Sequence, residues 1–83
     1  MEYDLILARS VTYAQRMQSD LNRIGIRRQI FRAPRDLTDL GCAYLVRIRP
    51  NDLAAALPAL RRAGLGPLRI YLQRGGDFQE VSL

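Results

Sequence analysis

The single cysteine, Cys42, is the side chain best suited to covalent chemistry in this sequence. A thiol attacks as the thiolate, and neighbouring cations lower its pKa. Arg32 ends a predicted strand and Arg35 lies in the loop that follows, so both can reach a thiol at the exit of that loop. Gly41, directly before the cysteine, lets the backbone approach a ligand closely. A buried structural cysteine stays open as the alternative, because strand alternation turns Cys42 toward the covered face of the sheet.

The rest of the composition excludes the common catalytic sites. With no histidine and one cysteine, the chain has no four-ligand zinc site of the usual kind, no Ser-His-Asp triad and no Cys-His pair. Asp36 and Asp39 lie on a predicted loop, where solvated carboxylates make a poor general acid–base pair. Ser10 has no base to activate it and suits a helix cap. The sequence therefore predicts a protein that is not an enzyme.

All 13 basic residues are arginine, and against 8 acidic residues they leave a formal charge of +5. They are spread along the chain without forming a run. A sheet of the RNA-recognition type stacks bases on aromatic side chains of its central strands. Here the predicted open-face positions of those strands include Ile6 and Leu45 instead. We therefore expect weak, salt-sensitive binding at most, and no specific nucleic-acid partner.

The hydropathy of the chain predicts neither a membrane helix nor a secretory signal. No apolar run approaches the roughly 20 residues that a membrane helix needs. The start of the sequence, residues 1–4, is acidic and lacks the basic region of a signal peptide. These features predict a cytoplasmic protein with no membrane partner.

Hydrophobic periodicity predicts one domain, residues 1–74, with four strands and two helices. The best-marked helix begins at a Ser10 cap and ends before Gly25. A second helix follows Pro50 and contains Pro58 in its interior. After the turn expected at 75–77, the tail to residue 83 forms either a short edge strand or a frayed end. The strands are predicted at residues 3–8, 26–32, 42–49 and 68–73.

The order strand-helix-strand-strand-helix-strand predicts an α+β fold. Short connections and right-handed crossovers favour a ferredoxin-like split βαβ sandwich, in which two helices cover one face of a four-stranded antiparallel sheet. We expect the loop that carries Cys42 at the end of the sheet where both helices terminate. The partial negative charge of helix C-termini disfavours a thiolate there, so arginine would have to stabilise it.

Alternation along the strands divides the sheet into two faces. It assigns Leu5 and Leu7 to the face that the helices cover. The opposite, open face receives an apolar centre with an arginine rim. Such a face is a homodimer or partner surface, or else it is simply solvated. The candidate partner residues on it are Ile6, Phe31, Leu45, Arg47, Arg69 and Tyr71.

Several residues at fixed spacing resemble a known family. They are Ala14 in the first helix, the pair Gly25-Ile26, the segment Pro34-Arg35-Asp36-Leu37, then Cys42-Ala43 and the strand Tyr44-Leu45-Val46-Arg47. In this order, over residues 3–72, the chain resembles the small bacterial selenium/sulfur carrier-like proteins. Ala43 stands where that family has a glycine after the cysteine.

The resemblance implies a non-enzymatic carrier that needs no cofactor, because its cargo is held on a side chain. Cys42 would hold a sulfur or selenium atom as a persulfide or selenosulfide and pass it on. Arg35 would lower the pKa of the thiol or steady the anionic terminal atom, while Pro34 and Gly41 shape the loop. Its partners would be sulfur or selenium donor and acceptor proteins.

Two other classes of function remain open from the residues alone. A regulatory or scaffold module would use the open face to associate with itself or with another protein, and its mass in solution would depend on concentration. A small-ligand sensor would bind a metabolite between paired subunits, but no residue specifies such a ligand, so this alternative rests on analogy at the level of the fold.

Overall fold

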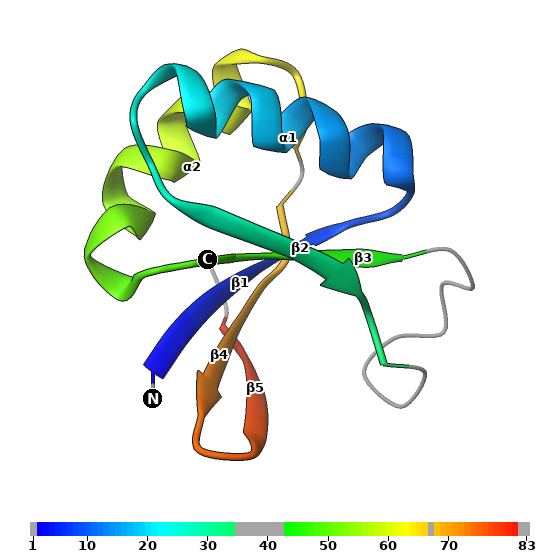
Figure 1. Ribbon diagram of the computed structural model, residues 1–83, viewed down its shortest axis with the longest axis vertical. Coiled ribbons are helices and arrows are strands. Elements are labelled where there is room, and N and C mark those ends of the chain that lie inside the picture. Colours follow the sequence, from blue (N-terminus) through cyan, green and yellow to red (C-terminus); the bar gives the residue numbers. More distant parts are fainter. Residues whose placement is uncertain (1, 35–42, 67, 82–83) are drawn as a thin grey trace.

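Two helices cover one face of a five-stranded antiparallel sheet in the computed structural model, which describes residues 2–34, 43–66 and 68–81 (Figure 1). The strands follow the order β2-β3-β1-β4-β5 across the sheet. The predicted α+β class and the two helices are confirmed, and the tail after the Gly75-Gly76 turn forms a fifth strand. The elements are β1 (Glu2–Ala8), α1 (Val11–Arg23), β2 (Arg28–Arg32), β3 (Tyr44–Ile48), the 3-10 turn η1 (Pro50–Asp52), α2 (Leu53–Arg62), β4 (Ile70–Arg74) and β5 (Asp77–Val81).

Helix α1 begins and ends where its sequence signals predict. The Ser10 hydroxyl accepts a hydrogen bond from the Tyr13 N–H at 3.3 Å, which satisfies one of the free donors of the first turn. After the helix, Gly25 has a φ of +78°, a backbone conformation that side chains strongly disfavour. The following N–H, of Ile26, donates to the Leu21 carbonyl at 2.9 Å. These local bonds fix both ends of the helix.

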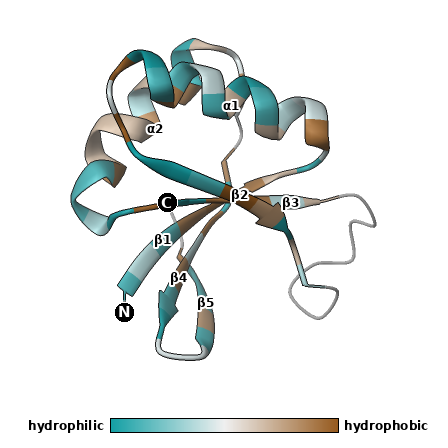
Figure 2. Cartoon of the chain, in the orientation of Figure 1, coloured by the Kyte–Doolittle hydropathy of each residue, from teal (hydrophilic) through white to brown (hydrophobic). Residues whose placement is uncertain are grey.

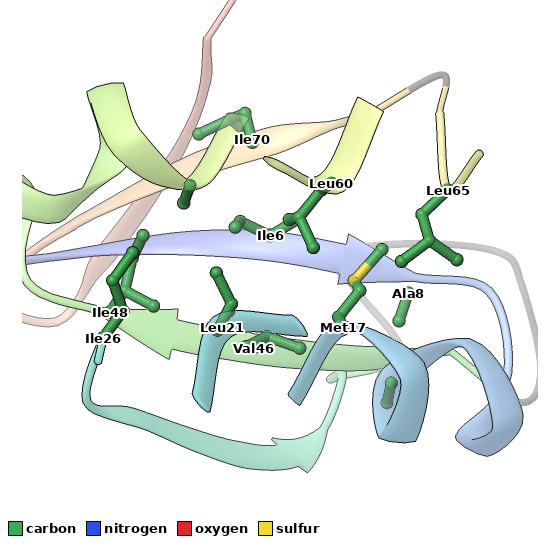
Figure 3. Close-up of a cluster of buried hydrophobic side chains, with 12 residues drawn as sticks. Ile6, Ala8, Met17, Leu21, Ile26, Val46, Ile48, Leu60, Leu65 and Ile70 are labelled. Carbon is green, nitrogen blue, oxygen red and sulfur yellow. The ribbon is translucent and has the colours of Figure 1, made fainter. Parts of the chain in front are cut away.

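Helix α2 tolerates a proline in its interior. Pro58 is exposed, so its ring and its missing N–H face away from the core. The opposite side of the helix buries Ala56 and Leu60 completely. Figure 3 shows the Leu60 side chain between α2 and β1, close to Ile6. No helix in the described ranges is long and apolar enough to cross a membrane.

The main core lies between the helices and the sheet (Figure 3). Met17 and Leu21 of α1 pack there against Ile6 and Val46 of the central strands. The sequence-based assignment of β1 to the two faces is therefore wrong: Ile6 lies on the covered face and Leu5 on the open one. In β1 the register pairs Ile6 with Val46, and both faces of this central strand are buried. A run that is apolar on both sides carries no alternation from which its phase can be predicted.

A second apolar cluster lies on the open face. Leu5, Leu7, Ala43, Leu45 and Tyr71 are all buried there, although no helix covers them. Partly buried apolar residues of the same chain pack against this cluster instead; they are Tyr3, Phe31, Ala33 and Phe78.

Asp4 is a buried carboxylate on β1, with 4% of its surface exposed. Its Oδ1 lies 3.7 Å from Nη2 of Arg74, too far for a hydrogen bond. Burial raises the pKa of Asp4 above its ordinary value of 3.8, and the positive charge of Arg74 offsets this effect only in part. The folded state therefore binds more protons than the unfolded state just above pH 3.8, and stability falls as the pH rises through this range.

We expect Asp4→Asn to be more stable than the wild type at neutral pH, because the amide removes the cost of burying a charge. The advantage should shrink as the pH falls below 3.8, where Asp4 is protonated in both states. Urea unfolding of both proteins at several pH values measures the difference. A variant that is less stable at neutral pH would show that the attraction to Arg74 outweighs the desolvation.

Candidate functional site

The connection between β2 and β3 is closed by a hydrogen bond at its base. The Ala33 N–H donates to the Ala43 carbonyl at 3.0 Å, which extends the β2–β3 ladder beyond both strands. Arg32 is exposed at the end of β2, and Pro34 is half-buried just after it. The other predicted carrier residues, Arg35, Gly41 and Cys42, lie outside the described residues. The ladder thus fixes both stems of the segment that contains the thiol.

The direction of α1 corrects one electrostatic expectation. Tyr44 of β3 is paired with Ala8 of β1 and with Arg32 of β2, so β1 and β2 end at the same end of the sheet. Helix α1 starts directly after β1 and therefore begins at this end, while only α2 terminates there (Figure 1). The expectation that both helices end beside the β2–β3 connection is wrong. The partial positive charge of the α1 N-terminus favours anions at this end of the sheet.

A mostly apolar pocket of about 160 Å³ lies at the same end of the sheet. Leu7 from β1, Met17 from α1 and Leu65 after α2 line it, and Arg9 and Arg69 supply its positive charge. The Arg9 guanidinium lies 4.2 Å from the centre of the Tyr13 ring and also donates to the Tyr13 hydroxyl. Sequence analysis missed this pocket because its walls come from three separate segments.

Five of the six residues proposed for the partner face lie on the open face. Leu45 and Tyr71 are buried in its apolar cluster, and Phe31 packs beside them. Arg47 lies over the Phe31 ring at 5.7 Å, while Arg69 lies over the Tyr71 ring at 5.8 Å. Ile6 is the exception, since it packs into the main core on the other face.

Tyr3 is the residue that the sequence analysis missed on the open face. The Arg47 guanidinium stacks over its ring at 4.5 Å and donates to Oε1 of Gln29. This arrangement places an aromatic side chain on the central strand β1, where the sequence-based phase of the strand had put none. Because the sequence-based phase of β1 was wrong, the predicted open face lacked this aromatic ring.

A second pocket, of about 170 Å³, lies where β2 begins and β3 ends. Four arginines line it, together with Tyr3 and Gln29. The register explains how they meet, since Arg28 is paired with Ile48. In the sequence, two arginines lie where β2 begins and two more where β3 ends, and this pattern indicates the pocket. The four residues are Arg27, Arg28, Arg47 and Arg49.

Comparison with protein-family models, with curated proteins and with solved structures found no match to this chain. Within residues 2–34, 43–66 and 68–81, no cluster of three or more histidine, cysteine, aspartate or glutamate side chains could hold a metal ion.

Proposed function

We propose that this protein is a non-enzymatic carrier that holds a sulfur or selenium atom on the side chain of Cys42. The observation that carries the proposal is the position of this single cysteine in the chain, directly before Ala43, whose carbonyl is anchored to Ala33. The resemblance of residues 3–72 to the selenium/sulfur carrier-like proteins supports the same role. A non-enzymatic carrier needs no resident cofactor, because its cargo is bound covalently.

Loading of the carrier is an exchange at sulfur without net oxidation. The Cys42 thiolate attacks the terminal sulfur of a persulfide on a donor protein. A new S–S bond forms on Cys42 while the S–S bond of the donor breaks, and the donor cysteine leaves as a thiolate that takes up a proton. A donor selenosulfide transfers selenium in the same way. An acceptor nucleophile later attacks the terminal atom, and Cys42 leaves as the thiolate.

The charges at this end of the sheet support a reactive thiol. Arg32 ends β2, Arg9 precedes α1, and the first turn of α1 has its partial positive charge here. Arg35 is the further cation that the resemblance assigns to the site. Positive charge lowers the pKa of a thiol and stabilises a terminal persulfide anion. Pro34 would restrict the backbone of the loop, and Gly41 would let the backbone approach a ligand closely.

The order of helices and strands predicts a ferredoxin-like fold, and we infer that this chain adopts it with one added strand. Two features support this inference: the strand order β2-β3-β1-β4, and the position of both helices on one face. Strand β5 then extends the sheet beyond β4.

The alternative function is association through the open face, as a homodimer or with another protein. The centre of this face is already closed within one chain, because Leu5 and Leu45 are fully buried. An association surface would therefore consist of the half-buried rim, Tyr3, Phe31 and Arg47 among them. Sedimentation over a range of concentrations distinguishes this function, because a carrier that acts alone keeps the mass of one chain.

Loading by a cysteine desulfurase with cysteine as substrate tests the carrier. The intact mass of the reduced wild-type protein should increase by one sulfur atom and return to its original value after a reductant is added. Cys42→Ser should not load. Arg35→Gln should shift the pH midpoint of alkylation upward, since the thiol loses a neighbouring cation.

A displaced thiol is the matched control. The double variant Cys42→Ser/Ala55→Cys carries its only cysteine on the exposed surface of α2. We expect the wild type to load at least about tenfold faster, in proportion to its larger thiolate fraction at neutral pH. Equal rates of loading would show that Cys42 reacts as any exposed cysteine does and would overturn the proposed function.

A further inference from the structure

The basic pocket at the start of β2 concentrates positive charge in one place. Its lining includes Arg27 and Arg28, directly before and at the start of β2, and Arg47 and Arg49, at and directly after the end of β3. Figure 2 shows the first part of β2 in the colour of hydrophilic residues, before the strand turns hydrophobic. Four arginines line a volume of about 170 Å³, and like charges this close together repel one another unless an anion neutralises them.

The described carboxylates do not neutralise these arginines. Glu2 and Asp4, the acidic residues of β1, are both turned toward Arg74 instead, at 3.7 Å each. Within the described part of the chain, neither Arg27 nor Arg49 forms an ion pair. Among the residues that the structure describes, none of those lining the pocket is acidic. Its charge is therefore available to a ligand.

One feature holds part of the pocket in place. Arg47 is fixed by its stacking on the Tyr3 ring at 4.5 Å and by its hydrogen bond to Gln29. Arg28 is paired with Ile48 of the main core, so its side chain lies on the other face of the sheet, where Nη1 donates to the Ile26 carbonyl at 3.3 Å. The charges that an anion would meet in the pocket are therefore those of Arg27, Arg47 and Arg49.

We propose that this pocket binds a ligand with two or more linked phosphate groups. The planar guanidinium group matches the oxygens of a phosphate in a bidentate manner, and it stays charged at all physiological pH values. A single phosphate group carries a charge of only about −1.5 to −2 at neutral pH, which the charges of Arg27, Arg47 and Arg49 together exceed. Linked phosphates occur in free polyphosphates and in the backbone of a nucleic-acid strand.

This site is independent of the carrier function. The pocket lies at the beginning of β2, whereas the segment with Cys42 follows the end of the same strand. At about 3.3 Å per residue, the strand from Arg28 to Ala33 separates the pocket from the start of that segment by roughly 16 Å. Loss of one activity should therefore leave the other intact.

The test measures binding of sodium tripolyphosphate by isothermal titration calorimetry at low salt. The variant Arg27→Gln/Arg49→Gln removes two exposed charges from the pocket. The control Arg16→Gln/Arg61→Gln removes two exposed charges from the helices, so both variants lower the net charge by two units from +5. We expect the pocket variant to lose affinity roughly tenfold or more, and the control less than about twofold. Thermal unfolding verifies that both variants are folded.

A short single-stranded uridine oligonucleotide forms the second arm. Tighter binding of the oligonucleotide than of tripolyphosphate, with the same loss in the pocket variant, would support the site and assign the phosphates to a nucleic-acid strand. If the pocket variant loses affinity for tripolyphosphate but not for the oligonucleotide, the result would support a small phosphate ligand. An equal loss in both variants would show an effect of net charge only and would overturn the site, as would failure of both probes to bind.

Discussion

Leu45→Ala is expected to lower the free energy of unfolding by about 2–5 kcal/mol, which for a domain of this size lowers Tm by roughly 10–30 °C. Leu45 lies on the face of the sheet that no helix covers, yet its side chain is fully buried. It is paired with Leu7 on one side and with Phe31 on the other. Removing its side chain leaves a cavity in the second apolar cluster, and the paired strands cannot close that cavity.

Two further variants calibrate the effect of Leu45→Ala. Leu21→Ala removes the same side chain from the main core, where it is also fully buried, and should cost a similar amount. Val11→Ala alters a side chain that is 46% exposed and should change stability by less than about 0.5 kcal/mol. Urea unfolding followed by circular dichroism measures all three. If Leu45→Ala resembled Val11→Ala, the open face would be solvated and free for a partner.

Removal of β5 by truncation after Gly76 should lower the free energy of unfolding by about 2–4 kcal/mol. Strand β5 is paired with β4 from Ile70 to Arg74. Its Val81 packs against the main core and its Phe78 against the open-face cluster, so the strand contributes to both. The truncated chain would also expose the edge of β4, and an exposed edge promotes pairing between chains.

Gln79→Ala provides the matched control, because Gln79 is exposed on the same strand and belongs to neither cluster. It should leave stability within about 0.5 kcal/mol of the wild type. Hydrogen exchange of the β4 amides gives a second readout, since exchange should accelerate only in the truncated chain. A truncated protein as stable as the whole chain would show that residues 77–81 add nothing to the sheet.

The elements that depend on neighbouring residues could be predicted from the sequence. The Ser10 cap, the apolar spacing through Ala14, Met17 and Leu21, and the glycine after the helix all act within a few residues. The same holds for the turn at Gly75, whose φ is +63°. Short-range hydrogen bonds and backbone preferences decide such features, so the sequence contains them directly.

The candidate carrier site could be predicted only as a set of residues. The sequence identifies Cys42 as the single thiol and places Arg32 and Arg35 near it in the chain. The direction of α1 relative to this segment depends on how β1 and β2 lie in the sheet, and the sequence-based expectation for it was wrong. The arginine pocket likewise depends on the β2–β3 register, which brings Arg27 and Arg49 together across 21 intervening residues.

The sequence by itself determined the number, type and order of the first six helices and strands of this protein, because each has its own local pattern. Only the tertiary structure decided the phase of β1, where Ile6 and Leu5 are equally apolar and both are fully buried. It also decided whether the tail would pair, since β5 is held by contacts with β4 and with both clusters. In each case the stabilising contacts come from residues distant in the chain. The hydrophobic effect favours burial of an apolar side chain, but it does not specify which face of a strand is buried until those residues are in place.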